Sequence, residues 1–167
     1  MSIKKLSTSG LFIAMGVALS FFYIPIGAAK CFPIQHMINV LSAVLLGPVY
    51  AVSIAFATSL IRVLMSTGSF LAFPGSMIGA LLSGLLYHQT KKLSMAYFGE
   101  AFGTGILGAL AAYPVAALVM GREVAAFAFV IPFLISTAVG ALLGVVLIKG
   151  IQKTGVLETL NNNHSHI

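Results

Sequence analysis

The chain has 167 residues, of which 59% are hydrophobic and only 7% are charged, and its mean hydropathy is +1.07. A soluble domain has about 25% charged residues, so this composition excludes an ordinary soluble protein and predicts a chain that is solvated by lipid. The net charge of +6 could suggest a nucleic-acid partner, but the basic residues stand singly or in pairs near the ends of apolar stretches, as membrane topology requires. We therefore expect no nucleic-acid binding.

The first apolar stretch is Leu6–Ile24, which as a helix is about 28 Å long and can cross a hydrocarbon core of about 30 Å. More apolar stretches follow it, so we interpret it as a first membrane span rather than a cleaved signal peptide. Gly10, Ala14 and Ala18 share one face of this helix, and such small residues let another helix approach closely in lipid. The residues alone favour packing of this face against the chain's own helices.

The second apolar stretch, Ile34–Gly47, reaches only about 21 Å as a helix and is too short to cross the membrane alone. Prolines and a glycine interrupt the chain before it, and the segment 28–39 carries lysine, cysteine, glutamine, histidine and asparagine. Irregular backbone with polar groups survives at membrane depth only when it is buried in protein or lines a wet cavity. We interpret this segment as one wall of a binding site.

Four more spans are predicted, and the second of them is again short. They are Pro48–Met65, Pro74–Tyr87, Met95–Met120 and Val124–Ile148. The loop Ser66–Phe73 before the short span is therefore expected to dip inward as well. The fold class is an all-α membrane protein: residues 1–150 form one compact bundle of six transmembrane helices, and residues 151–167 form a polar cytoplasmic tail.

The basic residues predict the orientation of this bundle. An even number of spans puts both termini on one side, together with Lys4, Lys5, Lys91, Lys92, Lys149 and Lys153, whereas Lys30, Arg62 and Arg122 fall on the other side. Because the more basic side faces the cytoplasm, we expect a multi-pass protein with cytoplasmic termini. The two indented loops then open together to the outside and form a pocket.

Enzyme signatures are absent from the sequence. There is no GxxxxGK[ST] phosphate loop and no HExxH motif, and the chain contains no aspartate for a Ser-His-Asp triad. Cys31 and His36 are too few ligands for a metal site, so we expect no metal, no cofactor and no enzymatic activity. A small intramembrane hydrolase that uses Ser76 or Cys31 with His36 stays open as an alternative.

The remaining polar and aromatic residues are candidates for substrate binding. Arg62 and Glu100 are the costliest to place in lipid and are therefore functional candidates, although Glu100 could equally be a structural anchor. His36 and Asn39 share a helical face, where an interhelical hydrogen bond worth about 1 kcal/mol is the competing role. The candidate set is Lys30, Phe32, Gln35, His36, Asn39, Arg62, Ser69, Phe73, Ser76, Glu100 and Tyr113.

Three stretches carry a family resemblance: residues 27–39 (GAAKCFPIQHMIN), 67–79 (TGSFLAFPGSMIG) and 99–105 (GEAFGTG). Over about residues 3–150 the chain resembles the ThiW-type substrate-binding S-components of energy-coupling-factor (ECF) vitamin transporters. The resemblance implies a prokaryotic plasma-membrane protein that captures substrate outside, docks on a transmembrane coupling subunit with two ATPases, and releases substrate inside by toppling. It also implies that the first helix, through Ala14 and Ala18 with Gly10 beside them, faces the coupling subunit.

The ligand that the resemblance implies is 4-methyl-5-(2-hydroxyethyl)thiazole, the thiazole precursor of thiamin. A small neutral ring of this kind needs aromatic faces, a donor for its nitrogen and a partner for its hydroxyl, and the candidate residues include all three types. Lys30 and Arg62 bring more positive charge than a neutral ligand needs, so another thiamin-related or small anionic precursor stays open. A self-sufficient carrier that needs no ATPase is a further alternative.

Overall fold

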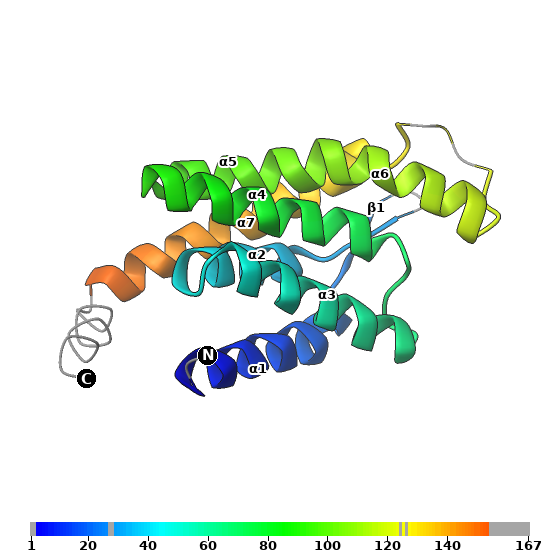
Figure 1. The fold of residues 1–167 in the computed structure, drawn as a ribbon. Helices are drawn as coiled ribbons and strands as arrows, with labels where there is room; N and C mark the ends of the chain where they lie inside the picture. The colour runs from blue at the N-terminus through cyan, green and yellow to red at the C-terminus, as the bar shows by residue number, and fades with distance from the viewer. Residues whose placement is uncertain (1–2, 27–28, 124, 126, 154–167) are drawn as a thin grey trace.

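The computed structural model describes residues 3–26, 29–123, 125 and 127–153, which form a helical bundle with one small hairpin (Figure 1). The first part of the chain comprises α1 (Ile3–Ala18), a 3-10 turn η1 (Leu19–Phe21), β1 (Ile24–Ile26), β2 (Ala29–Cys31), α2 (Pro33–Leu45) and α3 (Pro48–Leu64). The second part comprises α4 (Ala72–Thr90), α5 (Leu93–Phe102), η2 (Gly103–Gly108), α6 (Ala109–Pro114), η3 (Val115–Val119) and α7 (Val130–Lys153). The run from α5 to η3 is one continuous helix in which η2 and η3 are π-helical.

The helices lie side by side, with α2 packed against α3, α4 and α7 and with α1 resting on α3 at the edge (Figure 1). The start of α1, the α4–α5 turn and the end of α7 gather at one end of the bundle. The hairpin, the α3–α4 loop and the end of η3 gather at the other. The two predicted groups of basic residues are therefore at opposite ends of the molecule, as the orientation argument requires.

Most of the predicted apolar stretches are helical, but several of their boundaries differ. The first, predicted as Leu6–Ile24, is wrong at its end: α1 stops at Ala18, a 3-10 turn follows, and Ile24 belongs to β1, where its backbone pairs with Cys31. The fourth is longer than expected, because Pro74 lies within the first turn of α4, where proline is tolerated. The last begins at Val130 rather than Val124. Pro132 lies in its first turn, where proline does not kink a helix. Residues 151–153 of the predicted tail also belong to this helix. Residues 154–167 of that tail lie outside the described residues. The hairpin was not predicted.

Two helices are long and apolar enough to cross a membrane by length and composition. They are Leu93–Val119 and Val130–Lys153, whereas α2 and α3 are shorter apolar helices. The helical class is thus confirmed for the part of the chain that the structure describes. The arrangement as six membrane spans stays a prediction.

Side chains are distributed as expected for a protein in lipid. Large apolar residues such as Leu118, Ile131 and Val146 are 84%, 67% and 57% exposed, while serines, threonines and an asparagine are fully buried between the helices. The main cluster of buried apolar residues centres on Ile38, Val40 and Leu41 of α2. Small and polar interiors with apolar exteriors are typical of helices that associate in a bilayer.

Glycines bring α4 unusually close to the helix that contains α5 and η2. A methyl group added at Gly103 would lie 2.8 Å from the Cα atom of Gly79, and one added at Gly108 would lie 2.7 Å from the Cα atom of Gly75. Contacts of this length are too short for real side chains, so these positions require glycine. The close approach sets the side chains of Glu100 and Thr104 against α4, beside the site described next.

Candidate functional site

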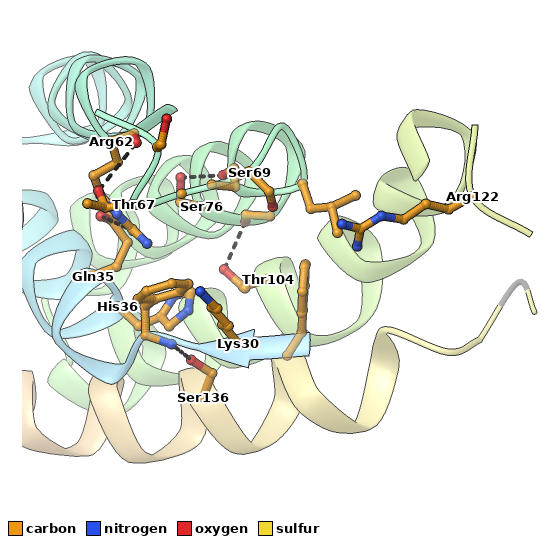
Figure 2. Close-up of a pocket in the computed structure, with 17 residues that line it drawn as sticks. Lys30, Gln35, His36, Arg62, Thr67, Ser69, Ser76, Thr104, Arg122 and Ser136 are labelled. Carbon is orange, nitrogen blue, oxygen red and sulfur yellow. Dashed lines mark hydrogen bonds between the residues drawn. The ribbon is translucent and has the colours of Figure 1, made fainter. Parts of the chain in front are cut away.

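A cavity of about 260 Å³ opens at the end of the bundle where the hairpin and the α3–α4 loop meet (Figure 2). Its walls come from the hairpin, four helices, η2 and two loops. The lining residues are Lys30, Phe32, Gln35, His36, Arg62, Ser66, Thr67, Gly68, Ser69, Leu71, Ala72, Gly75, Ser76, Thr104, Arg122, Phe133 and Ser136. The cavity is polar for the interior of an apolar protein, which is where a binding site is expected.

The hairpin forms one wall and is fixed to α7. Its antiparallel strands pair Pro25 with Lys30. The backbone N–H of Phe32 donates to the Ser136 hydroxyl at 2.8 Å, and the Cys31 thiol donates to the Pro132 carbonyl at 3.1 Å. These bonds satisfy the irregular backbone at this depth and hold Lys30 and Phe32 at the cavity.

Arg62, in the last turn of α3, is only 1% exposed although it lines the cavity. Its guanidinium carbon lies 3.8 Å from the centre of the Phe32 ring, a cation–π arrangement. Nη1 donates a long hydrogen bond of 3.4 Å to Oε1 of Gln35. Nε and Nη2 are buried without a hydrogen-bond partner among the described residues.

Behind the cavity, Glu100 is the centre of a buried hydrogen-bond network. Its Oε1 atom accepts from His36 Nδ1 at 2.9 Å, from Asn39 Nδ2 at 2.9 Å and from the Thr104 hydroxyl at 3.1 Å. Its backbone carbonyl accepts from the Thr137 hydroxyl of α7 at 3.1 Å. The carboxylate thereby joins α2, η2 and α5, and its Oε2 atom has no hydrogen-bond partner among the described residues.

The network also orients the polar groups of α2. Asn39 donates to the Ser76 carbonyl at 3.1 Å and accepts from Gln35 Nε2 at 3.3 Å. Because Nδ1 of His36 donates to Glu100, Nε2 of a neutral His36 is left as an acceptor at the cavity. The site can thus offer a hydrogen-bond acceptor at His36, hydroxyl groups, and the rings of Phe32 and Phe133 as flat apolar surfaces.

Comparison with protein-family models matches most of the chain. The family model described as "Thiamine-precursor transporter protein (ThiW)" covers residues 6–154 of the chain. The chain belongs to the ThiW family. A search of curated proteins found no match. The family and the two long apolar helices confirm the predicted class, a membrane protein that functions in transport.

In this ThiW-family protein the predicted site residues fall into two groups. Those that line the cavity are Lys30, Phe32, Gln35, His36, Arg62, Ser69 and Ser76. Asn39 and Glu100 lie behind the lining, where they hold its members in place. Phe73 packs on Phe56 and Phe70, with ring centres 5.6 and 6.4 Å away, and Tyr113 of α6 is not among the lining residues and is 38% exposed.

The sequence reasoning did not select several lining residues. The most polar of these are Thr67, Thr104, Arg122 and Ser136, which come from four separate places in the chain. Arg122 extends from the end of η3 toward the cavity (Figure 2). Its single signal was a charge in the predicted outer turn. Thr104 stood beside Glu100 in a glycine-rich stretch, which is a weak signal for a polar site.

Within the described residues of this ThiW-family chain, no three histidine, cysteine or acidic side chains lie close enough together to hold a metal ion. Cys31 is 2% exposed and its thiol is bonded to Pro132. The Ser76 hydroxyl donates to the carbonyl of Ala72 at 2.8 Å. Neither group is arranged as a nucleophile paired with His36.

The predicted docking face on α1 points away from the rest of the chain. Gly10, Ala14 and Ala18 are all exposed, and nothing lies within 4 Å of a methyl group placed at Gly10. Gly16, on the opposite side of the helix, packs against Thr58 of α3. Among the described residues, the small-residue strip therefore has no packing partner within this chain.

Proposed function

We propose that the chain is the substrate-capture component of an ECF-type importer, which binds 4-methyl-5-(2-hydroxyethyl)thiazole outside the cell and delivers it inward. The observation that carries this proposal is the cavity of about 260 Å³, lined by polar side chains, in a member of a thiamine-precursor transporter family. Small-molecule sites usually measure about 300–1,000 Å³, so this cavity suits a single small ring better than a whole vitamin.

The chemistry of the lining supports a heteroaromatic alcohol. Phe32 and Phe133 can pack on the faces of a thiazole ring. His36, which is oriented by Glu100, can accept a hydrogen bond from the ligand hydroxyl. Glu100 and Asn39 act as positioning residues, because they contact lining residues and not the cavity itself.

Coupling to a separate energising module is the second part of the proposal. Helices in lipid associate through close contact at small residues, and the strip Gly10, Ala14 and Ala18 is exposed and smooth. We assign this strip to a transmembrane coupling subunit that carries two ATPase subunits. The chain itself has no GxxxxGK[ST] phosphate loop.

The same proposal includes the location. Both termini would lie in the cytoplasm of a prokaryotic cell, and the cavity would open outward, because the lysine pairs gather at the end of the bundle opposite the cavity. Toppling of the chain against the coupling subunit would then turn the cavity inward.

Two rival functions make different predictions. A hydrolase built on Ser76 or Cys31 would need one of these groups to donate to Nε2 of His36. Instead the Ser76 hydroxyl donates to the Ala72 carbonyl and the Cys31 thiol donates to the Pro132 carbonyl. A self-sufficient carrier would transport without ATPase subunits. Only the proposed function requires both an exposed docking strip and a partner.

Two experiments test the proposal. Calorimetric titration of the purified chain should give saturable binding of the hydroxyethylthiazole and much weaker binding of thiamin and of the pyrimidine precursor. Proteoliposomes that contain the chain should accumulate the thiazole only when the coupling module and ATP are also present. Uptake by the chain alone would identify a carrier, and conversion of the ligand would identify an enzyme.

A further inference from the structure

The cavity is lined by three cationic side chains and by no carboxylate. Arg62 lies on one side, Arg122 on the other and Lys30 between them (Figure 2). Glu100 is nearby, but it is fully buried behind the lining and its Oε1 atom is already occupied by three donors. The cavity therefore carries a strong positive potential.

The charge of Arg62 is not compensated by the protein. Among the described residues, the contact of His36 with Glu100 is the one pairing of a basic with an acidic side chain, and it does not involve Arg62. Arg62 has only the long bond to Gln35 and the Phe32 ring, and two of its nitrogen atoms are buried without partners. A buried charge is strongly destabilising unless an opposite charge and hydrogen bonds satisfy it, so this guanidinium is a site prepared for an anion.

Two helix starts add to the positive potential. α2 begins at Pro33 and α4 begins at Ala72, and residues in the first turns of both helices line the cavity. The N-terminal end of a helix carries a partial positive charge and favours anions, phosphate groups above all. Both helices are long enough, at 13 and 19 residues, to have a developed dipole.

We propose that the cavity contains a phosphate subsite at Arg62, flanked by Lys30 and Arg122, and that the preferred ligand is the phosphate monoester of the thiazole alcohol. The inference rests on the proposed function for the thiazole part of the ligand. A phosphate is favoured over a carboxylate because a monoester carries nearly two negative charges at neutral pH and three cations face the cavity. The guanidinium fork of Arg62 matches phosphate oxygens in a two-bond contact.

The test is calorimetric titration of the full chain in phosphatidylcholine nanodiscs with three probes: hydroxyethylthiazole, its phosphate monoester and inorganic phosphate. The monoester should bind at least about tenfold more tightly than the alcohol, a difference of about 1.4 kcal/mol. This preference should shrink as the salt concentration rises. Arg62→Gln should abolish it and Arg62→Lys should retain part of it.

One control variant and one additional test variant keep the test decisive. Lys92→Gln removes an exposed cation at the far end of the bundle and should leave the preference unchanged. If Arg62→Gln does not fold, Lys30→Gln, which removes an exposed charge from the hairpin, should still reduce the preference. Equal binding of the alcohol and the monoester by the folded wild-type chain would overturn the phosphate subsite and leave the proposed function intact.

The two proposals fail in different ways. Binding of inorganic phosphate that depends on Arg62, without binding of either thiazole, would support the subsite and overturn the proposed function. Repeating the titration in nanodiscs with phosphatidylglycerol distinguishes a lipid headgroup as the source of the phosphate. Two results together would assign the cations to lipid and overturn the inference. In phosphatidylglycerol nanodiscs, no soluble probe would bind in an Arg62-dependent way, and in phosphatidylcholine nanodiscs the monoester would bind no more tightly than the alcohol.

Discussion

Replacing Glu100 with alanine would remove the acceptor on which three buried donors converge. His36 and Asn39 reach it from α2, and Thr104 reaches it from η2. In Glu100→Ala the three bonds to this acceptor are lost inside a water-poor interior, where an unsatisfied group is costly. Asn39 can still donate to the Ser76 carbonyl and Thr104 to the Gly75 carbonyl, so His36 is the donor left without its partner. The variant therefore tests whether this network stabilises the packing of the two helices.

The expected cost follows from the number of bonds. Hydrogen bonds between membrane helices contribute about 0.6 kcal/mol on average and at most about 1.7 kcal/mol, so three bonds predict a loss of about 2 to 5 kcal/mol. For a chain of this size each kcal/mol lowers the melting temperature by about 2–4 °C. Glu100→Ala should consequently melt about 4–20 °C below the wild type.

The assay is thermal unfolding in detergent, followed by intrinsic fluorescence or circular dichroism. Glu100→Gln keeps an oxygen acceptor, but bonds to a neutral acceptor are about half as strong, so this variant should melt between the wild type and Glu100→Ala. The matched control is Glu123→Gln, since Glu123 is exposed and its loss should change stability by less than about 0.5 kcal/mol. A Glu100→Ala protein as stable as the control would refute the structural role of the network.

Three further predictions concern ligand, orientation and docking. His36→Ala should bind the hydroxyethylthiazole at least about tenfold more weakly by calorimetry, and unchanged affinity would exclude ligand contact by this histidine. A cysteine at Ser69 should react with an impermeant maleimide from outside intact cells while one at Ser94 does not, and the reverse pattern would invert the topology. Ala14→Trp with Ala18→Trp should keep ligand affinity within about threefold while cellular uptake falls to background. Normal uptake would place the docking face elsewhere.

Sequence reasoning selected the part of the candidate cavity lining that is local in the chain. Lys30, Gln35 and His36 could be found because polar residues close together stand out in an apolar sequence with an interrupted helix. Arg62 could be found because an arginine in an apolar helix has few roles other than a functional one.

The rest of the lining depends on packing that no local pattern encodes. Thr104 is at the cavity because glycines let its helix approach α4, and Ser136 is there because the hairpin bonds to it. The hairpin itself was hidden, because Pro25 and the nearby Gly27 are residue types typical of a loop. The start of α4 was misplaced because Pro74, which often marks a helix start, lies inside the first turn here.

The packing of Gly16 gives α1 a mechanical role. A methyl group at Gly16 would lie 2.7 Å from the Thr58 methyl carbon of α3, so α1 and α3 are in direct contact at this point. Thr58 is one helical turn from Arg62, which lines the cavity. α1 itself gives no residue to the cavity lining. A force applied to its outer strip would nevertheless pass directly into α3, so a partner that pulled on α1 would carry the filled cavity with it.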